Sequence, residues 1–221
     1  MPYKEVKKSA LYEAAKRLMD VFFATISLLI FLPIIFIVAI TIKLNSSGPV
    51  LADTPHRVGR NGKQFKMFKF RSMVENAHEI LRENPKYAKL FSDYKKGSYK
   101  LINDPRITSV GHVIRKYSLD EIPQLINVLI GEMSIVGPRA YYPDELRDQQ
   151  KEYPSTRDAV KVVLSVKPGI TGFWQVSGRS QINFDKRIEM DRHYVMQRSI
   201  LYDLWIIAKT PWAMISAKGA L

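Results

Sequence analysis

The sequence predicts an α+β protein, mainly α-helical, that is attached to a membrane through its N-terminal part. Three observations predict this class: residues 21–42 carry no charge, the pair Asn61-Gly62 is typical of a β-hairpin turn, and much of the remaining chain places apolar residues at helical spacing. With 221 residues, the chain has room for one domain besides the membrane segment.

The uncharged segment, residues 21–42, is interrupted by Pro33 near its centre. A straight helix of this length would reach about 33 Å, enough to cross the hydrocarbon core of a bilayer. Proline removes an amide donor and clashes with the carbonyl group four residues earlier, so we expect a kinked helix. Basic residues flank both ends, and they favour the cytoplasmic side of a membrane. They are Lys16 and Arg17 before the segment and Lys43, Arg57, Arg60 and Lys63 after it.

Two basic flanks favour a re-entrant membrane helix, which enters one leaflet and returns to the same side. A plain single span and a buried helix of a soluble protein stay open as alternatives. A signal peptide is disfavoured because the apolar run is too long and no Ala-x-Ala site follows it. We therefore divide the chain into an amphipathic lead-in with the re-entrant helix, residues 1–46, and a main domain, residues 47–221.

Turn residues and apolar spacing predict the next elements. Residues 56–71 form a small β-hairpin around Asn61-Gly62. A helix begins after Ser72 and ends before Pro85, and residues 84–106 are expected to be a polar, mobile loop with a short helix.

A further helix follows residues 118–121 and stops at Gly131. Residues 132–180 are rich in turns, and two helices, about 183–198 and 202–217, close the chain. The apolar stripe of the last helix holds tryptophans, which suits an interfacial helix on a membrane. Packing of that stripe on the domain core is an equal alternative.

The composition narrows the set of partners. The net charge is +13, from 34 Lys and Arg against 21 Asp and Glu, which suits nucleic acid, anionic lipid headgroups or phosphorylated substrates. The apolar segment favours the last two, and no nucleic-acid-binding module is recognisable, so we expect no nucleic-acid partner. The absence of cysteine excludes disulfides, thiolate zinc sites and a cysteine nucleophile.

Asp120 and Glu121 lie where a helix is predicted to begin. A helix N-terminus offers partial positive charge and free amide donors, so a carboxylate there stays ionised and a phosphate can bind beside it. The ordinary alternative is a capping box formed by Ser118 and Glu121. Pro123 argues against that box, because it should hold Ile122 away from helical angles and leave Glu121 facing a ligand.

Cationic residues around this acidic pair are candidates for phosphate binding. Arginine presents a planar fork that fits phosphate oxygens, and turns containing glycine allow the backbone to approach a ligand. Each of these cations could equally be an ordinary surface charge or a snorkelling strand residue. The candidates are Lys69, Arg71, Arg115, Arg139 after Gly137-Pro138, and Arg179 after Gly178.

Four sequence blocks follow one another in a fixed order. They are KFRSM (69–73); DPRIT with IRKYSLDEIPQLINVL (104–108 and 114–129); GEMSIVGPR (131–139); and KPGITGFWQVSGR (167–179). Together with the proline-broken segment, they closely resemble the bacterial sugar transferases, the monotopic polyprenyl-phosphate phosphoglycosyl transferases. The resemblance runs from about Lys16 to the final helix.

This resemblance implies an undecaprenyl-phosphate sugar phosphotransferase of the bacterial inner (cytoplasmic) membrane, with residues 47–221 as a catalytic domain on the cytoplasmic face. A UDP-sugar would donate its sugar 1-phosphate to undecaprenyl phosphate, with release of UMP and a need for Mg²⁺. This reaction initiates the synthesis of exopolysaccharide, capsule, lipopolysaccharide O-antigen or another glycan. Membrane lipids and a second copy of the chain, in a homodimer, are further candidate partners.

The resemblance also assigns roles to individual residues. Asp120 matches the family's nucleophile, which forms a covalent phospho-sugar intermediate in a ping-pong reaction. Glu121 matches its partner acid and would hold the metal together with Asp120. Arg139 matches the arginine of the family's Pro-Arg-Pro motif.

The chain departs from the family pattern at three places. Leu32 stands where a serine often precedes the membrane proline, Ala140 replaces the last proline of Pro-Arg-Pro, and residues 51–56 lack an expected glutamine. Many relatives carry spanning helices upstream, so we expect this chain to be a minimal catalytic unit.

Three other functions stay open at this point. A non-catalytic membrane scaffold would bind anionic lipids with its basic face. A basic nucleic-acid binder would leave the apolar segment unexplained. A different lipid phosphotransferase or a phosphatase would release other products. The identity of the sugar, the glycan pathway and the oligomeric state do not follow from these residues.

Overall fold

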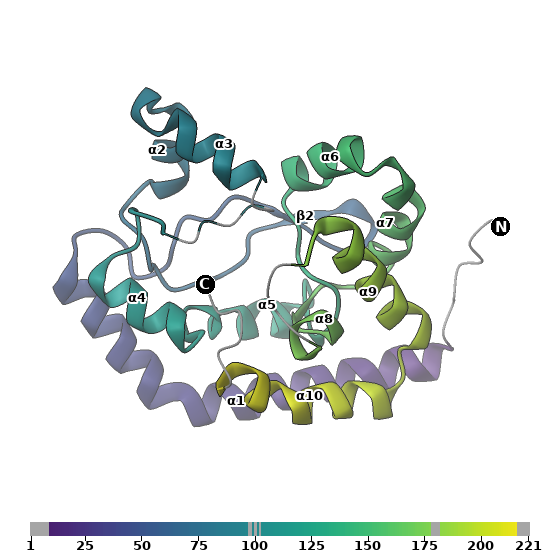
Figure 1. Cartoon of the computed structure of the whole chain (residues 1–221). Helices are drawn as coiled ribbons and strands as arrows, with labels where there is room; N and C mark the ends of the chain where they lie inside the picture. Colours follow the sequence, from purple (N-terminus) through teal and green to yellow (C-terminus); the bar gives the residue numbers. More distant parts are fainter. Residues whose placement is uncertain (1–8, 97–98, 100, 102, 178–181, 216–221) are drawn as a thin grey trace.

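A long N-terminal helix, α1 (Ala10–Asn45), contains both the predicted lead-in and the apolar segment. It is seen in a computed structural model that describes residues 9–96, 99, 101, 103–177 and 182–215. The Ser9 side chain caps the helix by accepting a hydrogen bond from the Tyr12 amide at 3.2 Å. Pro33 lies inside α1, whose ribbon changes direction along its length (Figure 1). Within the described residues, α1 is the helix that is long and apolar enough to cross a membrane.

The first turns of α1 face the domain with their polar residues. The Lys16 ammonium lies 3.2 Å from Asp20 and 3.1 Å from Asp203, and it also donates to the Val136 carbonyl at 3.2 Å. On the opposite side, the Leu18 side chain is 73% exposed. A helix of a water-soluble domain buries its apolar side, so the first turns of α1 are inverted and their outer side suits an apolar surrounding.

The two halves of α1 pack against different parts of the domain. Before Pro33, Ala24 belongs to the main core cluster, where it is joined by Phe23 and Leu28. After Pro33, Val38 and Ile42 join a second cluster with Phe70 and with Ile114 of α4 (Ser109–Lys116). The helix therefore stays against the domain on both sides of the proline.

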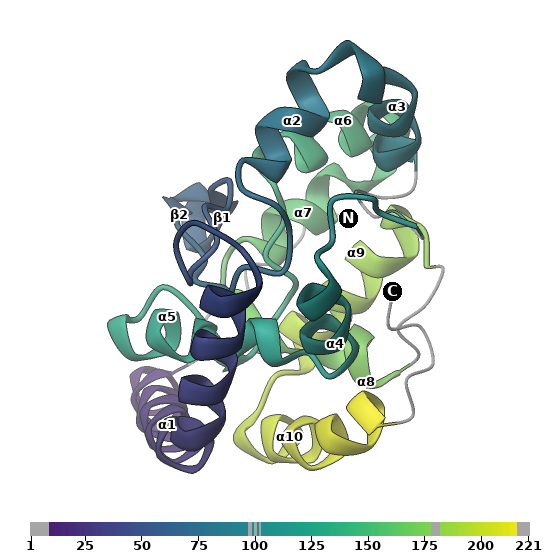
Figure 2. The same cartoon turned by 90° about the vertical axis from the view of Figure 1, so that its left-hand side faces the viewer.

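The last helix, α10 (Ile200–Ile215), lies beside α1 on one face of the molecule (Figures 1 and 2). Its inner side carries the buried residues Asp203 and Ile206. Its predicted apolar stripe points outward, since Leu201, Leu204, Trp205 and Trp212 are exposed. The alternative in which this stripe packs on the core is therefore wrong, and α1 and α10 present apolar residues on the same face.

The predicted hairpin is confirmed, although it is short. Strands β1 (Arg57–Val58) and β2 (Gln64–Phe65) pair antiparallel, with Arg57 opposite Phe65. The connection is the 3₁₀ turn η1 (Arg60–Gly62), in which Asn61 and Gly62 have φ of 58° and 80°. Positive φ at both central residues is what a type I′ hairpin turn requires, and Asn-Gly supplies it at low cost.

The segment after the hairpin is more helical than predicted. Helix α2 (Ala77–Glu83) begins five residues after Ser72, and the 3₁₀ turn η2 (Pro85–Tyr87) leads into α3 (Ala88–Lys96). The stretch expected to be a loop with a short helix is thus largely helical up to residue 96. After it, α4 leads to the 3₁₀ turn η3 (Leu119–Glu121) and to α5 (Gln124–Ile130), which ends at Gly131 as predicted, with φ of 89°.

In residues 132–177, the part of the turn-rich stretch that the structure describes, there are also regular elements that the sequence analysis did not predict. The stretch contains two strands, three α-helices and a 3₁₀ turn: β3 (Ser134–Val136), α6 (Pro143–Glu152), η4 (Pro154–Thr156), α7 (Arg157–Val163), β4 (Gly169–Thr171) and α8 (Phe173–Val176). Strands β3 and β4 pair in parallel, and a Cβ atom added at Gly169 would lie 2.0 Å from the Gly137 amide nitrogen. A Cβ atom added at Gly137 would lie 2.6 Å from the Lys167 carbonyl oxygen, so both glycines serve close strand packing. The two closing helices are confirmed as α9 (Phe184–Gln197) and α10.

Candidate active site

A cavity of about 640 Å³ gathers most of the residues that the sequence singled out. Its walls come from α1, the segment after the hairpin, η3, α5, α8 and α10. The predicted site residues that line it are Lys69, Arg71, Arg115, Asp120, Glu121 and Arg139. Arg179 lies outside the described residues, and Pro33 lies in α1.

One cation joins the two acidic residues at the centre of this cavity. The Lys69 ammonium lies 2.8 Å from Glu121 Oε1 and 3.6 Å from Asp120 Oδ2. Asp120 is 7% exposed, whereas the side chain of Glu121 is 39% exposed. The shorter contact goes to the more exposed carboxylate, so Asp120 is oriented by Lys69 without a close hydrogen bond to it.

The extended segment that carries Lys69 is held by α5. The Asn127 side chain accepts a hydrogen bond from the Phe68 amide and donates one to the Lys66 carbonyl, both at 2.9 Å. The Phe70 amide donates to the Asp120 carbonyl at 3.0 Å. Because the backbone on both sides of Lys69 is fixed in this way, its side chain is directed at the acidic pair.

The capping box predicted at Ser118 is absent. Ser118 has φ of 54°, in the left-handed region, and its side chain makes no capping hydrogen bond. The Glu121 side chain contacts Lys69 across the cavity. The restraint expected from Pro123 is also wrong, since Ile122 has helical angles of −53° and −41°. The turn η3 therefore presents its two carboxylates to the cavity, and the local pattern Ser-x-x-Glu has no capping function here.

Burial and charge act against each other on Asp120. Burial raises the pKa of Asp120 above its usual range and Glu121 adds to the rise, while Lys69 and Arg115 act in the opposite direction. Burial also opposes the charge on Lys69, yet Glu121 and Asp120 raise the pKa of that ammonium group. The cations around Asp120 are thus what favours its ionised form in a buried position.

Arg115 reaches this site because α4 packs closely on the segment after Lys69. A Cβ atom added at Gly111 would lie 1.9 Å from the Ser72 carbonyl oxygen, so only glycine permits this approach. Thr108 caps the same helix by accepting from the Gly111 amide at 2.9 Å, and its own amide donates to the Ser72 carbonyl at 3.1 Å. Arg115, in the last turn of α4, then lines the cavity.

A residue of α9, Asp191, holds the loop that carries Arg139. Asp191 accepts hydrogen bonds from the Arg139 amide at 3.1 Å and from the Tyr141 hydroxyl at 2.9 Å. The Arg139 guanidinium lies 3.9 Å from Glu145, too far for a hydrogen bond but near enough to be oriented by its charge. Arg139 therefore faces the cavity from a rigid support.

Arg71 has a structural contact that the sequence did not predict. Its guanidinium donates to the Ser47 carbonyl and, at 3.0 Å, to the Ser46 carbonyl at the end of α1. Although Arg71 lines the cavity, its donors are largely used to hold the end of this helix. Its role in substrate binding stays a prediction.

Two further arginines in the cavity were not selected from the sequence. Arg57 donates to the Ala140 carbonyl at 2.9 Å and lies 3.3 Å over the ring of Tyr142. Arg106 forms a two-pronged pair with Asp104, at 2.7 Å and 2.6 Å. The sequence offered only weak indications for these two residues. Arg57 was noted only as a basic residue after the apolar segment, and Arg106 only as part of the DPRIT block.

The acidic pair fits a magnesium ion bound together with a substrate. Mg²⁺ is usually held by one or two carboxylates plus phosphate oxygens and water. Asp120 and Glu121 are adjacent, and the Glu121 side chain is open to the cavity. The described residues contain no group of three or more His, Cys, Asp and Glu side chains that could hold a metal alone. Two carboxylates leave most positions around such an ion to other ligands.

These features define a candidate enzyme site: a buried, oriented carboxylate, a second acid and several fixed cations beside an apolar helix. The family model for bacterial sugar transferases matches residues 11–217, and the chain belongs to this family. Its relatives identify it as an enzyme of the phosphoglycosyl transferase class.

Three relatives illustrate the likeness. The chain is 40% identical over 206 residues to "Exopolysaccharide production protein ExoY" of Rhizobium meliloti (strain 1021), covering 93% of this chain and 88% of that protein. It is 42% identical to the "Undecaprenyl-phosphate galactose phosphotransferase" of Salmonella typhimurium, covering 93% of this chain and 41% of the relative. It is 35% identical to the "UDP-glucose:undecaprenyl-phosphate glucose-1-phosphate transferase" of Escherichia coli (strain K12), covering 100% of this chain and 44% of the relative. The chain thus spans less than half of the last two proteins.

Replacement of the two hydroxyl residues Ser118 and Thr108 tests the geometry of η3. Thr108→Ala removes a genuine helix cap and should cost about 1 kcal/mol of unfolding free energy. Ser118→Ala removes no capping bond and should cost less than about 0.5 kcal/mol. Thermal unfolding of both variants in detergent provides the comparison, and an equal loss at Ser118 would show that this serine does cap the turn.

Proposed function

We propose that this protein transfers a sugar 1-phosphate from a UDP-sugar to undecaprenyl phosphate, with release of UMP, as the initiating step of an exopolysaccharide or related glycan. The observation that carries the proposal is the composition of the cavity around Asp120. Its polar part holds the acidic pair with Lys69, Arg115 and Arg139, and another part is lined by apolar residues of the membrane-facing helices.

The two parts of the cavity suit the two ends of a polyprenyl phosphate. Phe31 comes from α1, and Ile207 and Pro211 come from α10, the helices that present exposed apolar side chains. A lipid chain can contact these residues while its phosphate reaches the cations, so that bound geometry replaces a free encounter. The names of the relatives include both galactose and glucose transfer, which favours a UDP-hexose as donor.

Asp120 is the proposed nucleophile. Its carboxylate oxygen attacks the sugar-bearing phosphorus of the UDP-sugar, a new oxygen–phosphorus bond forms, and the bond from that phosphorus to the bridging oxygen breaks. UMP leaves with the bridging oxygen. A phosphate oxygen of undecaprenyl phosphate then attacks the same phosphorus and releases Asp120. Two displacements of this kind replace one difficult transfer between two anions.

The surrounding residues support both displacements electrostatically. Lys69 and Arg115 favour the ionised form of Asp120, and Arg139 presents a guanidinium that can bind phosphate oxygens. Glu121 and Asp120 are the residues that would hold Mg²⁺, which when bound neutralises phosphate charge. The cations of the chain must also keep the substrate phosphates within reach of Asp120.

The proposed location is the cytoplasmic face of the bacterial inner membrane, with α1 re-entrant. Both ends of α1 are tied to the same domain, through Lys16 and Asp203 at one end and through Arg71 and Ser46 at the other. A helix that crosses the bilayer would separate these ends by about 30 Å of hydrocarbon. The kink at Pro33 and the homodimer are further expectations of the same proposal.

A donor panel tests the reaction. Purified protein with Mg²⁺ and undecaprenyl phosphate should release UMP from at least one UDP-hexose, and Asp120→Asn should lower that rate by about 10³-fold or more, as for loss of a nucleophile. Asp158→Asn, which alters an exposed carboxylate on α7, is the matched control and should keep the rate. Full turnover by Asp120→Asn would reject this residue as nucleophile.

The pH dependence of UMP release tests the role of Lys69. Asp120 must be ionised to attack, and its burial-raised pKa is opposed by Lys69. Lys69→Met removes that opposing charge, so the pKa of Asp120 rises further and the acid limb of the kcat/KM profile moves to higher pH. Lys69→Arg keeps the charge and should leave the limb closer to its wild-type position. A limb that does not move in Lys69→Met would contradict this account.

A further inference from the structure

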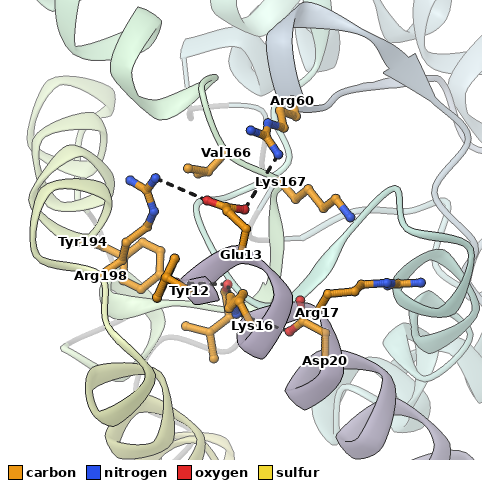
Figure 3. A pocket seen from close by; sticks show the side chains of 11 residues that line it. Tyr12, Glu13, Lys16, Arg17, Asp20, Arg60, Val166, Lys167, Tyr194 and Arg198 are labelled. Carbon is orange, nitrogen blue, oxygen red and sulfur yellow. Dashed lines mark hydrogen bonds and ion pairs between the residues drawn. The ribbon is translucent and has the colours of Figure 1, made fainter. Parts of the chain in front are cut away.

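A second, smaller cavity of about 50 Å³ lies between the first turns of α1, the hairpin turn and the end of α9 (Figure 3). It shares no lining residue with the cavity around Asp120. A buried water needs about 10–15 Å³ of such volume, so the space holds roughly three to five small groups. The four oxygens of one phosphate group are of that size.

The lining of this cavity is strongly basic. Five cations face two carboxylates, and the residues are Lys16, Arg17, Arg60, Lys167 and Arg198 with Glu13 and Asp20. Part of this charge is already used within the protein. Lys16 pairs with Asp20 and Asp203, and Arg17 donates to the carbonyls of Val128 and Leu129 at 2.6 Å and 2.7 Å. Arg198 also donates to the Val195 carbonyl at 2.7 Å. Lys167 and Arg60 are therefore the cations of this cavity that can serve a ligand.

Of these cations, Lys167 is the one whose charge is least compensated by partners within the protein. Within the described part of the chain, its side chain makes no hydrogen bond or ion pair. Burial lowers the pKa of Lys167, and the nearby charge of Arg17 lowers it further. In Figure 3, Lys167 and Arg17 extend to the same side of the cavity. A half-buried ammonium group beside a second positive charge is stabilised when an anion lies close to it.

Glu13 is a weak occupant of the other side of the cavity. Its carboxylate points between Arg60 and Arg198, at 3.9 Å and 3.7 Å, both longer than a hydrogen bond (Figure 3). The Glu13 side chain is 42% exposed, and an ion pair of this kind contributes little.

The surroundings of the cavity indicate the source of the anion. Three exposed apolar residues are close in sequence to residues that line the cavity: Leu11 and Leu18 on α1, and Leu201 on α10. We propose that this cavity binds the phosphate of an anionic phospholipid at the membrane surface, and that the contact holds the first turns of α1 on the bilayer. This site is separate from the transfer reaction and does not depend on it.

Thermal unfolding with a short-chain phospholipid tests the site. The full chain in a neutral detergent is titrated with dihexanoylphosphatidylglycerol, without nucleotide or polyprenyl phosphate, and a bound ligand raises Tm. Wild type should be stabilised, and Lys167→Gln should lose most of that shift. Lys209→Gln is the matched control, because it removes an exposed charge on α10 outside the cavity, and it should keep the shift. Equal loss in both variants would overturn the assignment of this cavity.

Two further measurements separate binding from structure and lipid from free anion. Without ligand, Lys167→Gln should unfold no earlier than wild type, since it removes an unbalanced cation, and a lower Tm together with an undiminished ligand shift would overturn the proposal. Inorganic phosphate at the same concentration should give a smaller shift than dihexanoylphosphatidylglycerol. An equal shift would overturn the assignment to a lipid.

Discussion

The inward-facing polar residues of α1 are the contact on which the rest of the structure depends. Asp20 is buried and accepts hydrogen bonds from Lys16, from the Ser134 hydroxyl at 2.9 Å and from the Ile135 amide at 3.0 Å. A buried ion pair is costly to desolvate and is tolerated when further hydrogen bonds compensate, and here Oδ1 of Asp20 accepts all three of these bonds. With these residues inside, the apolar side of α1 is left outside, where a membrane can cover it.

The same arrangement determines where the chemistry can occur. The cavity around Asp120 has walls from α1 and α10, so a group held there lies beside the apolar face of the molecule. In the proposed reaction, the site must attract phosphates and still leave the carboxylate of Asp120 reactive. Lys69 meets both needs because its shorter contact is with Glu121. Its ammonium group lies 3.6 Å from Asp120, where its positive charge stabilises the carboxylate without a close hydrogen bond.

Local sequence signals predicted local structure well, but they did not predict contacts between segments that are far apart in the sequence. Asn61-Gly62 and Gly131 adopt the positive φ that their turns require, because glycine and asparagine reach this region at low cost. The parallel pairing of β3 with β4 joins segments far apart in the chain, and no local pattern reports it. Ser118 shows the limit most clearly, since Ser-x-x-Glu is a capping pattern that the left-handed backbone at Ser118 makes ineffective. In the site, residue types and motif order predicted the acidic pair, which lies in the cavity, whereas the bonds from Arg71 to the end of α1 required the folded chain.

The most direct test of the central claim is a measurement of the membrane topology of α1 by cysteine labelling. The chain has no cysteine, so Ser9→Cys and Ser47→Cys each introduce a single thiol, one before the helix and one just after it. Labelling with a membrane-impermeant maleimide is compared in intact spheroplasts and in inverted membrane vesicles. The account predicts that both thiols react only in the inverted vesicles, where the cytoplasmic face is outside. Reaction of the two thiols from opposite sides would contradict it.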